Sequence, residues 1–170
     1  WIIQNAFSMC TECRKYYPEF RVSINLSYVQ ILKSPLMMEL KQIIDHSGIS
    51  CSGIIVELTE SGYLEGTPAV RSVWNDMKKL RIQIALDDFG TGYSNLMNIS
   101  NLEPDIVKLD RGFTLKALSR SYEYQLMQYV IEMVHKLNQY VCVEGVETKE
   151  DLEKIKALGP DLIQGYYYSK

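Results

Sequence analysis

The 170-residue sequence has no long hydrophobic run and no excess of positive charge. No apolar segment approaches the roughly 18 residues that a membrane-spanning helix needs, and the first residues lack the layout of a signal peptide. The formal net charge is −3, and no basic stripe is present that would bind a nucleic-acid backbone. These absences exclude membrane contact by this segment and a nucleic-acid polymer as partner, and they predict a soluble, cytoplasmic domain.

Cysteine and histidine are also scarce. The four cysteines are too few for a disulfide scaffold of this length, so we expect free thiols in a reducing compartment (Cys10, Cys13, Cys51 and Cys142). Cys10 and Cys13 form a Cys-x-x-Cys pair inside an amphipathic helical stretch, but no second pair at zinc-site spacing accompanies them. The two histidines, His46 and His135, stand alone in helical runs. A zinc site is therefore not predicted.

The chemistry of the chain concentrates in residues 82–94, Ile-Gln-Ile-Ala-Leu-Asp-Asp-Phe-Gly-Thr-Gly-Tyr-Ser. An alternating apolar and polar run predicts a half-buried strand, which we expect Asp87, Asp88 and the following glycines to end. Two adjacent carboxylates repel each other unless a cation lies between them or one stays protonated. The alternative is an Asp-Asp-x-Gly turn whose carboxylates are simply solvated.

Short apolar strands and amphipathic helices alternate along the rest of the chain. Strands are predicted at 21–26, 54–58, 106–109, 141–144 and 162–166, besides the one that contains Asp87. Helices are predicted at 1–17, from Ser34-Pro35 to Gly48, from Thr67-Pro68 to Leu80, at 122–138, and from Thr148 to Gly159-Pro160. Strand followed by helix, repeated along the chain, predicts a parallel sheet with helical crossovers.

Three of these helices carry specific signals. Pro35 is expected in the first turn after a Ser34 cap, and Gly48 is expected to end that helix. Thr148 with Asp151 resembles a capping box. The helix at 122–138 is expected to place Leu126, Val130, Val134 and Leu137 on one side. The first helix has no capping residue before it, so we expect a chain cut inside a longer domain.

Each predicted strand ends on a polar or charged residue. These residues are Asn25, Glu57, Asp87 with Asp88, Lys108, Glu144 and Gln164. Because functional sites of parallel α/β folds are built at the carboxyl edge of the sheet, six such ends predict one shared site.

The oxygen donors Asn25, Glu57, Asp87 and Asp88 favour Mg²⁺, Mn²⁺ or Ca²⁺ over zinc. Adjacent aspartates suit a pair of cations, an arrangement used in phosphoester cleavage. Glu144 could hold the second cation or take a proton from water, and Lys108 could orient that water. The alternative for Lys108 is an ion pair with Asp87 or Asp110.

Six motifs in order closely resemble the EAL-domain family, which comprises bacterial cyclic-di-GMP phosphodiesterases and their degenerate relatives. They are Asn-Leu-Ser at 25–27, Glu-Leu-Thr-Glu-Ser at 57–61, Asp-Asp-Phe-Gly-Thr-Gly-Tyr-Ser at 87–94, Lys-Leu-Asp-Arg at 108–111, Glu-Gly-Val-Glu-Thr at 144–148 and Gln-Gly-Tyr at 164–166. The resemblance runs from end to end of the chain. It implies a (β/α)8 TIM-type barrel that hydrolyses cyclic-di-GMP to the linear dinucleotide pGpG with two Mg²⁺ or Mn²⁺ ions.

The resemblance also implies a role for each matching residue. Metal ligands would be Asn25, Glu57, Asp87 and Asp88; catalytic residues would be Glu144, which activates water, Lys108, which positions it, and Gln164, which supports them. Glu60 and Thr91 would anchor the loop that follows Asp88.

The sequence departs from the family in lacking the namesake Glu-Ala-Leu tripeptide, whose glutamate is a metal ligand. A full barrel takes about 250 residues, so 170 residues with about six strands predict a partial EAL domain at 1–170, completed by more chain or by a homodimer. We expect weak or no activity from this chain alone. The alternatives to an enzyme are a cyclic-di-GMP-binding module that does not cleave its ligand and a dimerisation fragment.

Overall fold

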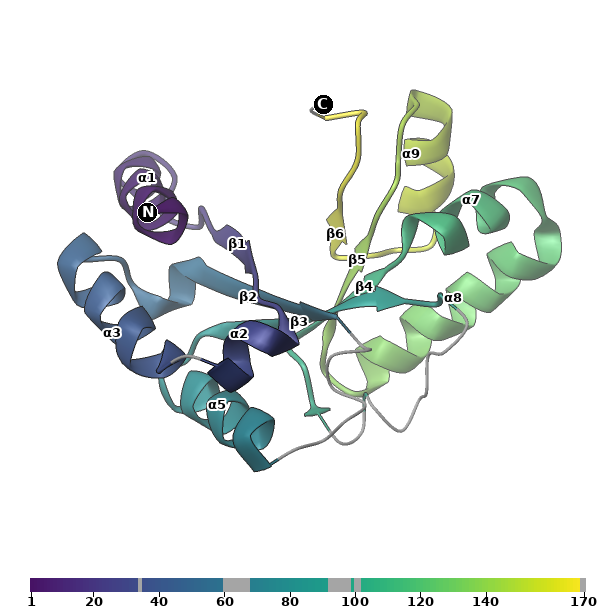
Figure 1. Cartoon of the computed structure of the whole chain (residues 1–170). Coiled ribbons are helices and arrows are strands. Elements are labelled where there is room, and N and C mark those ends of the chain that lie inside the picture. The colour runs from purple at the N-terminus through teal and green to yellow at the C-terminus, as the bar shows by residue number, and fades with distance from the viewer. Residues whose placement is uncertain (34, 60–67, 92–98, 100–101, 169–170) are drawn as a thin grey trace. The chain divides into compact units, whose positions relative to one another are not determined.

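The computed structural model describes residues 1–33, 35–59, 68–91, 99 and 102–168 (Figure 1). Two compact units make up the chain, Trp1–Ala85 and Leu86–Lys170. The strands follow chain order in the sheet, β1-β2-β3-β4-β5-β6, and the pairs β1–β2, β4–β5 and β5–β6 are parallel. The predicted parallel sheet with strands and helices in alternation is confirmed.

The N-terminal unit contains two parallel strands with helices packed beside them. Its elements are α1 (Ile2–Arg14), β1 (Val22–Asn25), α2 (Tyr28–Lys33), α3 (Leu36–Ser47), the 3₁₀ turn η1 (Cys51–Gly53), β2 (Ile54–Thr59) and α5 (Pro68–Lys79). Helices α1, α3 and α5 follow one another along the same side of β1 and β2 (Figure 1). The core of this unit is apolar, and Phe7, Ile54 and Met77 are fully buried in it.

Local signals explain where these helices end. Gly48 ends α3 with a left-handed φ of 64°, as expected. Pro35 is the N-cap residue of α3 rather than its first helical residue, and the predicted Ser34 cap lies outside the described residues. Helix α1 begins after Trp1 without any side-chain cap, and it is shorter at both ends than the predicted helix at 1–17.

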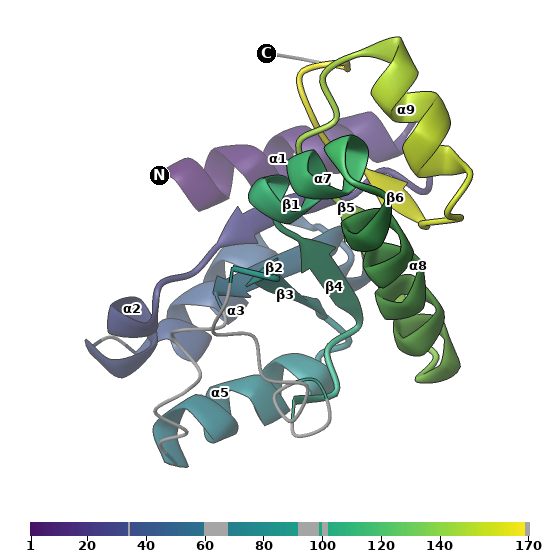
Figure 2. The ribbon, with the colours of Figure 1, turned by 90° about the vertical axis from the view of Figure 1, so that its right-hand side faces the viewer.

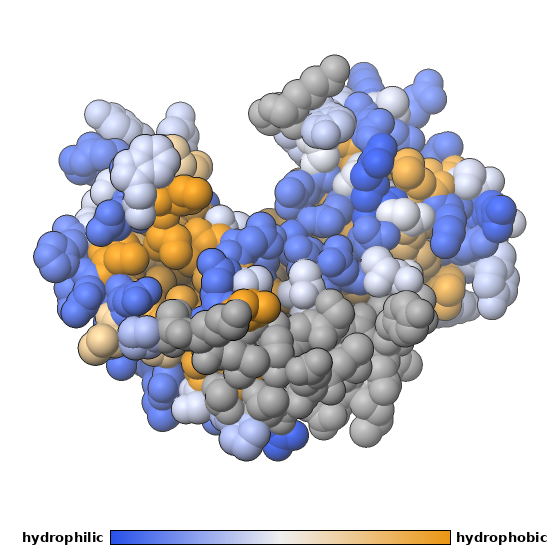
Figure 3. Space-filling view, in the orientation of Figure 1, coloured by the Kyte–Doolittle hydropathy of each residue, from blue (hydrophilic) through white to orange (hydrophobic). Residues whose placement is uncertain are grey.

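Helix α1 also exposes large apolar side chains. Ile2 and Met9 of α1 are exposed, as are Trp1 and Tyr16 just outside its two ends, and Figure 3 shows apolar surface on this unit directly below α1 in that view. Cys10 lies on the opposite, buried face of the helix, where burial raises the pKa of its thiol. All four cysteines are free thiols, as predicted.

The C-terminal unit has a similar plan. Its first strand is β3 (Gln83–Phe89), which begins in the preceding unit, and β4 (Ile106–Leu109), α7 (Arg111–Ser119), α8 (Ser121–Lys136), β5 (Tyr140–Val143), α9 (Lys149–Lys156) and β6 (Leu162–Ile163) follow. Helices α7, α8 and α9 pack together beside β4 and β5 (Figure 2). All four residues of β4 are buried, so its single charged residue, Lys108, lies inside the protein.

Several predictions for this unit are confirmed and others are corrected. Strand β4 has the predicted bounds, and Thr148 with Asp151 forms the complete capping box of α9. The apolar side expected for the helix at 122–138 is wrong in part: Val134 is buried, but Leu126 and Leu137 are exposed. The buried face of α8 consists of Met127, Ile131 and Val134, rotated from the predicted stripe. Across the described part of the chain, no helix has the length and apolar character of a membrane span.

Candidate active site

In the N-terminal unit the structure brings together two of the predicted metal ligands. Asn25 of β1 and Glu57 of β2 are direct partners in the parallel register, so both lie at the same level of the sheet. Glu57 is 8% exposed and accepts a hydrogen bond from the Ser23 hydroxyl. Glu57 is the fourth residue of β2 rather than its end, because the strand continues to Thr59. The pair offers a carboxylate and an amide oxygen close to each other.

Asp87 and Asp88 lie within β3 in the C-terminal unit, and the strand ends one residue after them, directly before Gly90, in the region predicted. Its last residue is Phe89, whose carbonyl accepts a hydrogen bond from the Asp110 N–H at 3.0 Å. Asp88 has a left-handed φ of 60°, and its backbone N–H donates to Asp87 Oδ1 at 3.1 Å. This backbone conformation is uncommon for a residue other than glycine and is tolerated best by Asp and Asn.

The carboxyl group of Asp88 is in an environment that disfavours its charge. Burial raises the pKa of Asp88, repulsion from the carboxylates of Asp87 and Asp110 raises it further, and the Lys108 ammonium lowers it. The net shift is upward. A cation beside these three carboxylates would therefore relieve an existing repulsion.

Lys108 is the central cation of the C-terminal unit. Its Nζ lies 3.0 Å from Asp87 Oδ1 and 2.7 Å from Glu144 Oε1. The Lys108 side chain is 5% exposed, and the two carboxylates keep 14% and 19% of their surface. The ion pair with Asp87 that the sequence left open as an alternative is therefore present, together with a second one to Glu144. Both carboxylates therefore form ion pairs with the same nitrogen, Lys108 Nζ.

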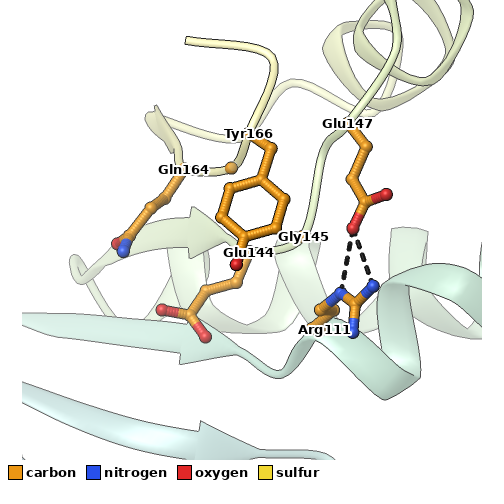
Figure 4. Close-up of a pocket in the computed structure, with 7 residues that line it drawn as sticks. Arg111, Glu144, Gly145, Glu147, Gln164 and Tyr166 are labelled. Atoms are coloured by element: carbon orange, nitrogen blue, oxygen red, sulfur yellow. Dashed lines mark hydrogen bonds and ion pairs between the residues drawn. The ribbon is translucent and has the colours of Figure 1, made fainter. Parts of the chain in front are cut away.

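Glu144 and Gln164 follow directly after β5 and β6, the positions at which parallel strands deliver side chains to the edge of the sheet. The predicted strand at 162–166 is shorter than expected, since β6 ends at Ile163. Both residues line an open cavity of about 220 Å³, together with Arg111, Gly145, Glu147, Gly165 and Tyr166 (Figure 4). The Glu144 N–H donates to Leu109 O at 3.1 Å, which ties the end of β5 to the end of β4.

Of the two predicted loop-anchoring residues, Thr91 alone lies in the described part of the chain. Thr91 is an exposed residue in a bend just after β3. Glu60 lies outside the described residues.

Sequence reasoning assigned no role to Arg111 and Glu147. Their side chains form an ion pair at 2.7 Å beside the same cavity. The two residues lie 36 positions apart, so no local pattern could pair them. Their membership of the Lys-Leu-Asp-Arg and Glu-Gly-Val-Glu-Thr motifs was the available signal.

The donor chemistry fits hard divalent cations. Carboxylate and amide oxygens are available in both units, and the ammonium of Lys108 already occupies a cationic position between two carboxylates. Within the described ranges, no group of three or more His, Cys, Asp and Glu side chains is arranged to hold a metal ion. The oxygen donors are therefore of the kind that such an ion prefers, and one of them, Asp87, forms an ion pair with Lys108.

Parallel strands alternating with helices, with acidic and amide groups in or directly after the carboxyl-terminal parts of the strands, are typical of a β/α-barrel, here an incomplete one with six strands. The sequence profile described as EAL domain matches residues 1–170. The chain therefore belongs to the EAL domain family, as its motifs predicted.

Known relatives support this assignment. The chain is 31% identical over 170 residues to cyclic di-GMP phosphodiesterase PdeF of Escherichia coli, covering 100% of this chain and 23% of that protein. It matches the EAL enzyme Bd1971, solved with cAMP and cyclic di-GMP bound, with a TM-score of 0.91 and 27% identity over 100% of this chain and 47% of the other. The PaMucR phosphodiesterase in complex with c-di-GMP gives a TM-score of 0.89 and 26% identity, over 100% and 69% of the two chains. The chain thus spans about a quarter of PdeF.

Proposed function

We propose that this domain is a metal-dependent phosphodiesterase that hydrolyses cyclic-di-GMP to the linear dinucleotide pGpG. Membership of the EAL family supports the proposal, as do relatives described as cyclic di-GMP phosphodiesterases. The structural observation that carries it is the contact of the buried Lys108 with both Asp87 and Glu144. A buried ammonium between a metal-binding type of carboxylate and a proton-accepting one suits the control of a reactive water.

The metal ligands in this proposal are Asn25, Glu57, Asp87 and Asp88, which would hold two Mg²⁺ or Mn²⁺ ions. Klebsiella pneumoniae BlrP1, which is 24% identical and shows likeness of fold alone, has been solved with manganese and c-di-GMP. When bound, such ions make water a stronger nucleophile and offset the negative charge of the phosphodiester.

Side chains of this chain would accept the proton of the attacking water and orient that water. Glu144 accepts a proton from the attacking water, and Lys108 donates hydrogen bonds that orient the water and the phosphate oxygen. Gln164, at the same cavity, would hold Glu144 or the substrate by its amide. One P–O bond forms from water, the bond from phosphorus to the 3′ oxygen breaks, and that oxygen takes up a proton. The phosphate stays on the 5′ oxygen, as pGpG requires.

Three finer assignments belong to the same proposal. Glu60 and Thr91 would anchor the loop after Asp88. The domain would act as a homodimer, and the exposed Tyr122, Leu126 and Tyr129 of α8 support this because they form an apolar stripe at helical spacing. A cytoplasmic location follows from the proposed substrate, which is an intracellular type of nucleotide signal.

A cyclic-di-GMP-binding module without catalysis is the second candidate. The observation in its favour is that no three-ligand metal cluster is formed among the described residues. Such a module would bind the nucleotide with the same site residues but would not hydrolyse it.

The test compares the complete EAL domain that contains this chain with its Glu144→Gln variant in Mn²⁺ and cyclic-di-GMP, measuring pGpG chromatographically and nucleotide binding by calorimetry. Glu150→Gln is the matched control, because it makes the same change at an exposed position of α9. We expect pGpG from the parent domain and the control, and a loss of at least about 100-fold in the Glu144 variant with binding retained. Binding without pGpG in the parent domain favours the second candidate, and absence of binding overturns both.

A further inference from the structure

The loop that carries Glu144 is held from two sides by other elements of the C-terminal unit. This loop, residues 144–147, leaves β5 and leads to the cap of α9. On one side it contacts Arg111, the first residue of α7, and on the other it contacts the segment that follows β6.

The guanidinium of Arg111 forms hydrogen bonds with the loop. Arg111 Nε and Nη2 donate to Glu147 Oε1 at 3.2 Å and 2.7 Å. Figure 4 shows this pair on one side of Gly145 and the Glu144 carboxylate directed away from it. The Glu144 carboxylate therefore points away from the ion pair that holds the loop behind it.

The aliphatic part of Arg111 is packed equally closely. A Cβ placed on Gly145 would lie 2.4 Å from Arg111 Cγ and 2.9 Å from Arg111 Cβ, and Gly145 has a φ of +80°. Only glycine allows the loop to approach the arginine this closely in this conformation. This contact thus fixes the distance between the loop and the start of α7.

The other side of the loop is fixed by backbone hydrogen bonds. The Val146 N–H donates to Gln164 O at 3.2 Å, and Val146 O accepts from the Tyr167 N–H at 3.1 Å. A Cβ on Gly165 would lie 2.1 Å from Val146 O. With these contacts and the Glu144 N–H bond to Leu109 O, the loop is clamped between α7 and the end of β6.

We propose that Arg111 and Glu147 are positioning residues that hold the Glu144 loop so that its carboxylate meets Lys108. Lys108 and Arg111 belong to the same short segment, the end of β4 and the start of α7, so this segment carries the partners of both Glu144 and Glu147. An exposed ion pair contributes little to stability, and the Arg111 and Glu147 side chains are 57% and 36% exposed. The pair therefore affects the position of the loop more than it affects folding.

The kinetic test rests on the proposed phosphodiesterase function and uses Glu147→Ala in the complete EAL domain that contains this chain. We expect kcat to fall about tenfold with KM changed by less than about twofold, because a side chain that orients a catalytic group acts after substrate binds. The double variant Arg111→Glu/Glu147→Arg reverses the pair, and its glutamate keeps the Cβ and Cγ atoms that contact Gly145. We expect this swap to restore kcat to within about threefold of the parent.

Glu123→Ala is the control, since Glu123 pairs with Arg120 at 3.2 Å on α8 in the same unit. Amide hydrogen exchange supplies a readout that needs no activity. In Glu147→Ala the N–H groups of Glu144 and Val146 should exchange about tenfold faster than in the parent, and in the control they should not change.

Unchanged exchange in Glu147→Ala overturns the proposal whether or not the chain is active. Faster exchange with an unchanged kcat also overturns it, because the loop would then move without affecting the reaction. If the parent produces no pGpG, the phosphodiesterase function fails and the exchange result alone decides whether the clamp exists. Faster exchange together with rescue by the swapped pair supports it.

Discussion

Replacement of Lys108 by methionine gives the sharpest test of the electrostatics of the C-terminal unit. Methionine keeps an unbranched apolar stem but removes the ammonium that lies 3.0 Å from Asp87 Oδ1 and 2.7 Å from Glu144 Oε1. Two carboxylates that are less than one-fifth exposed then lose their shared cation. The variant should therefore be destabilised by the repulsion and poor solvation of these groups.

Breaking a buried ion pair typically destabilises a protein by about 3–5 kcal/mol, and because these carboxylates keep partial contact with water we take the lower end, about 3 kcal/mol. For a chain of this length, that loss lowers Tm by about 6–12 °C. The measurement is urea and thermal unfolding of the parent and the variant in EDTA at neutral pH.

The matched control is Lys116→Met on the exposed surface of α7, which should change stability by less than about 0.5 kcal/mol. Adding Mn²⁺ should stabilise Lys108→Met more than it stabilises the parent, because a divalent ion can replace the lost positive charge. If Lys108→Met has the same urea midpoint and Tm as the control variant, the two short ion-pair contacts contribute nothing to stability and the reasoning is refuted.

Three further predictions concern stability. Because the pKa of Asp88 is raised in the folded state, the metal-free parent should lose stability as pH rises from the unfolded-state pKa through the folded-state pKa. Asp88→Asn should therefore be more stable than the parent at neutral pH and equally stable in strong acid. The measurement is Tm as a function of pH in EDTA. Gly145→Ala meets Arg111 at 2.4 Å and should cost about 1–3 kcal/mol more than Gly159→Ala, where φ is also positive but nothing lies within 4 Å; equal urea midpoints would contradict this. Thr148→Ala removes half of a capping box and should cost about 1 kcal/mol, with faster amide exchange at the start of α9.

Local signals in the sequence predicted the elements well where one residue decides the conformation. Gly48 ends α3 in the left-handed region and Thr148 caps α9, and both act through their own backbone neighbourhood. The bounds of β4 were correct because its apolar run is short and stops at Asp110, which caps α7 by accepting from the Gly112 N–H at 2.7 Å.

Predictions failed where the outcome depends on packing between elements. Leu126 and Leu137 fit an apolar stripe equally well, but α8 is turned so that Met127 and Ile131 face the core instead. The sequence contains the periodicity of the helix but not the position of the surface against which it packs. The separate helix α7 was missed for a similar reason, since its buried Phe113 and Ala117 show too weak a pattern alone.

The candidate site shows the same division. Polar residues after parallel strands were found from the pattern alone, and Lys108 with Glu144 and Asp87 do meet in the structure. The Arg111–Glu147 pair was not found, because its partners come from different elements and neither stands at the end of a strand. Single-sequence reasoning locates groups on one edge, whereas the contacts between loops behind that edge need coordinates.

The backbone crossing at Gly165 has a consequence for recognising active members of this family. No side chain fits at position 165, since a Cβ there would collide with the Val146 carbonyl. Glycine in the Gln-Gly-Tyr motif is therefore required by the fold whether or not the domain cleaves anything. A relative that has lost its chemistry would keep this glycine, so the presence of the glycine carries no information about activity.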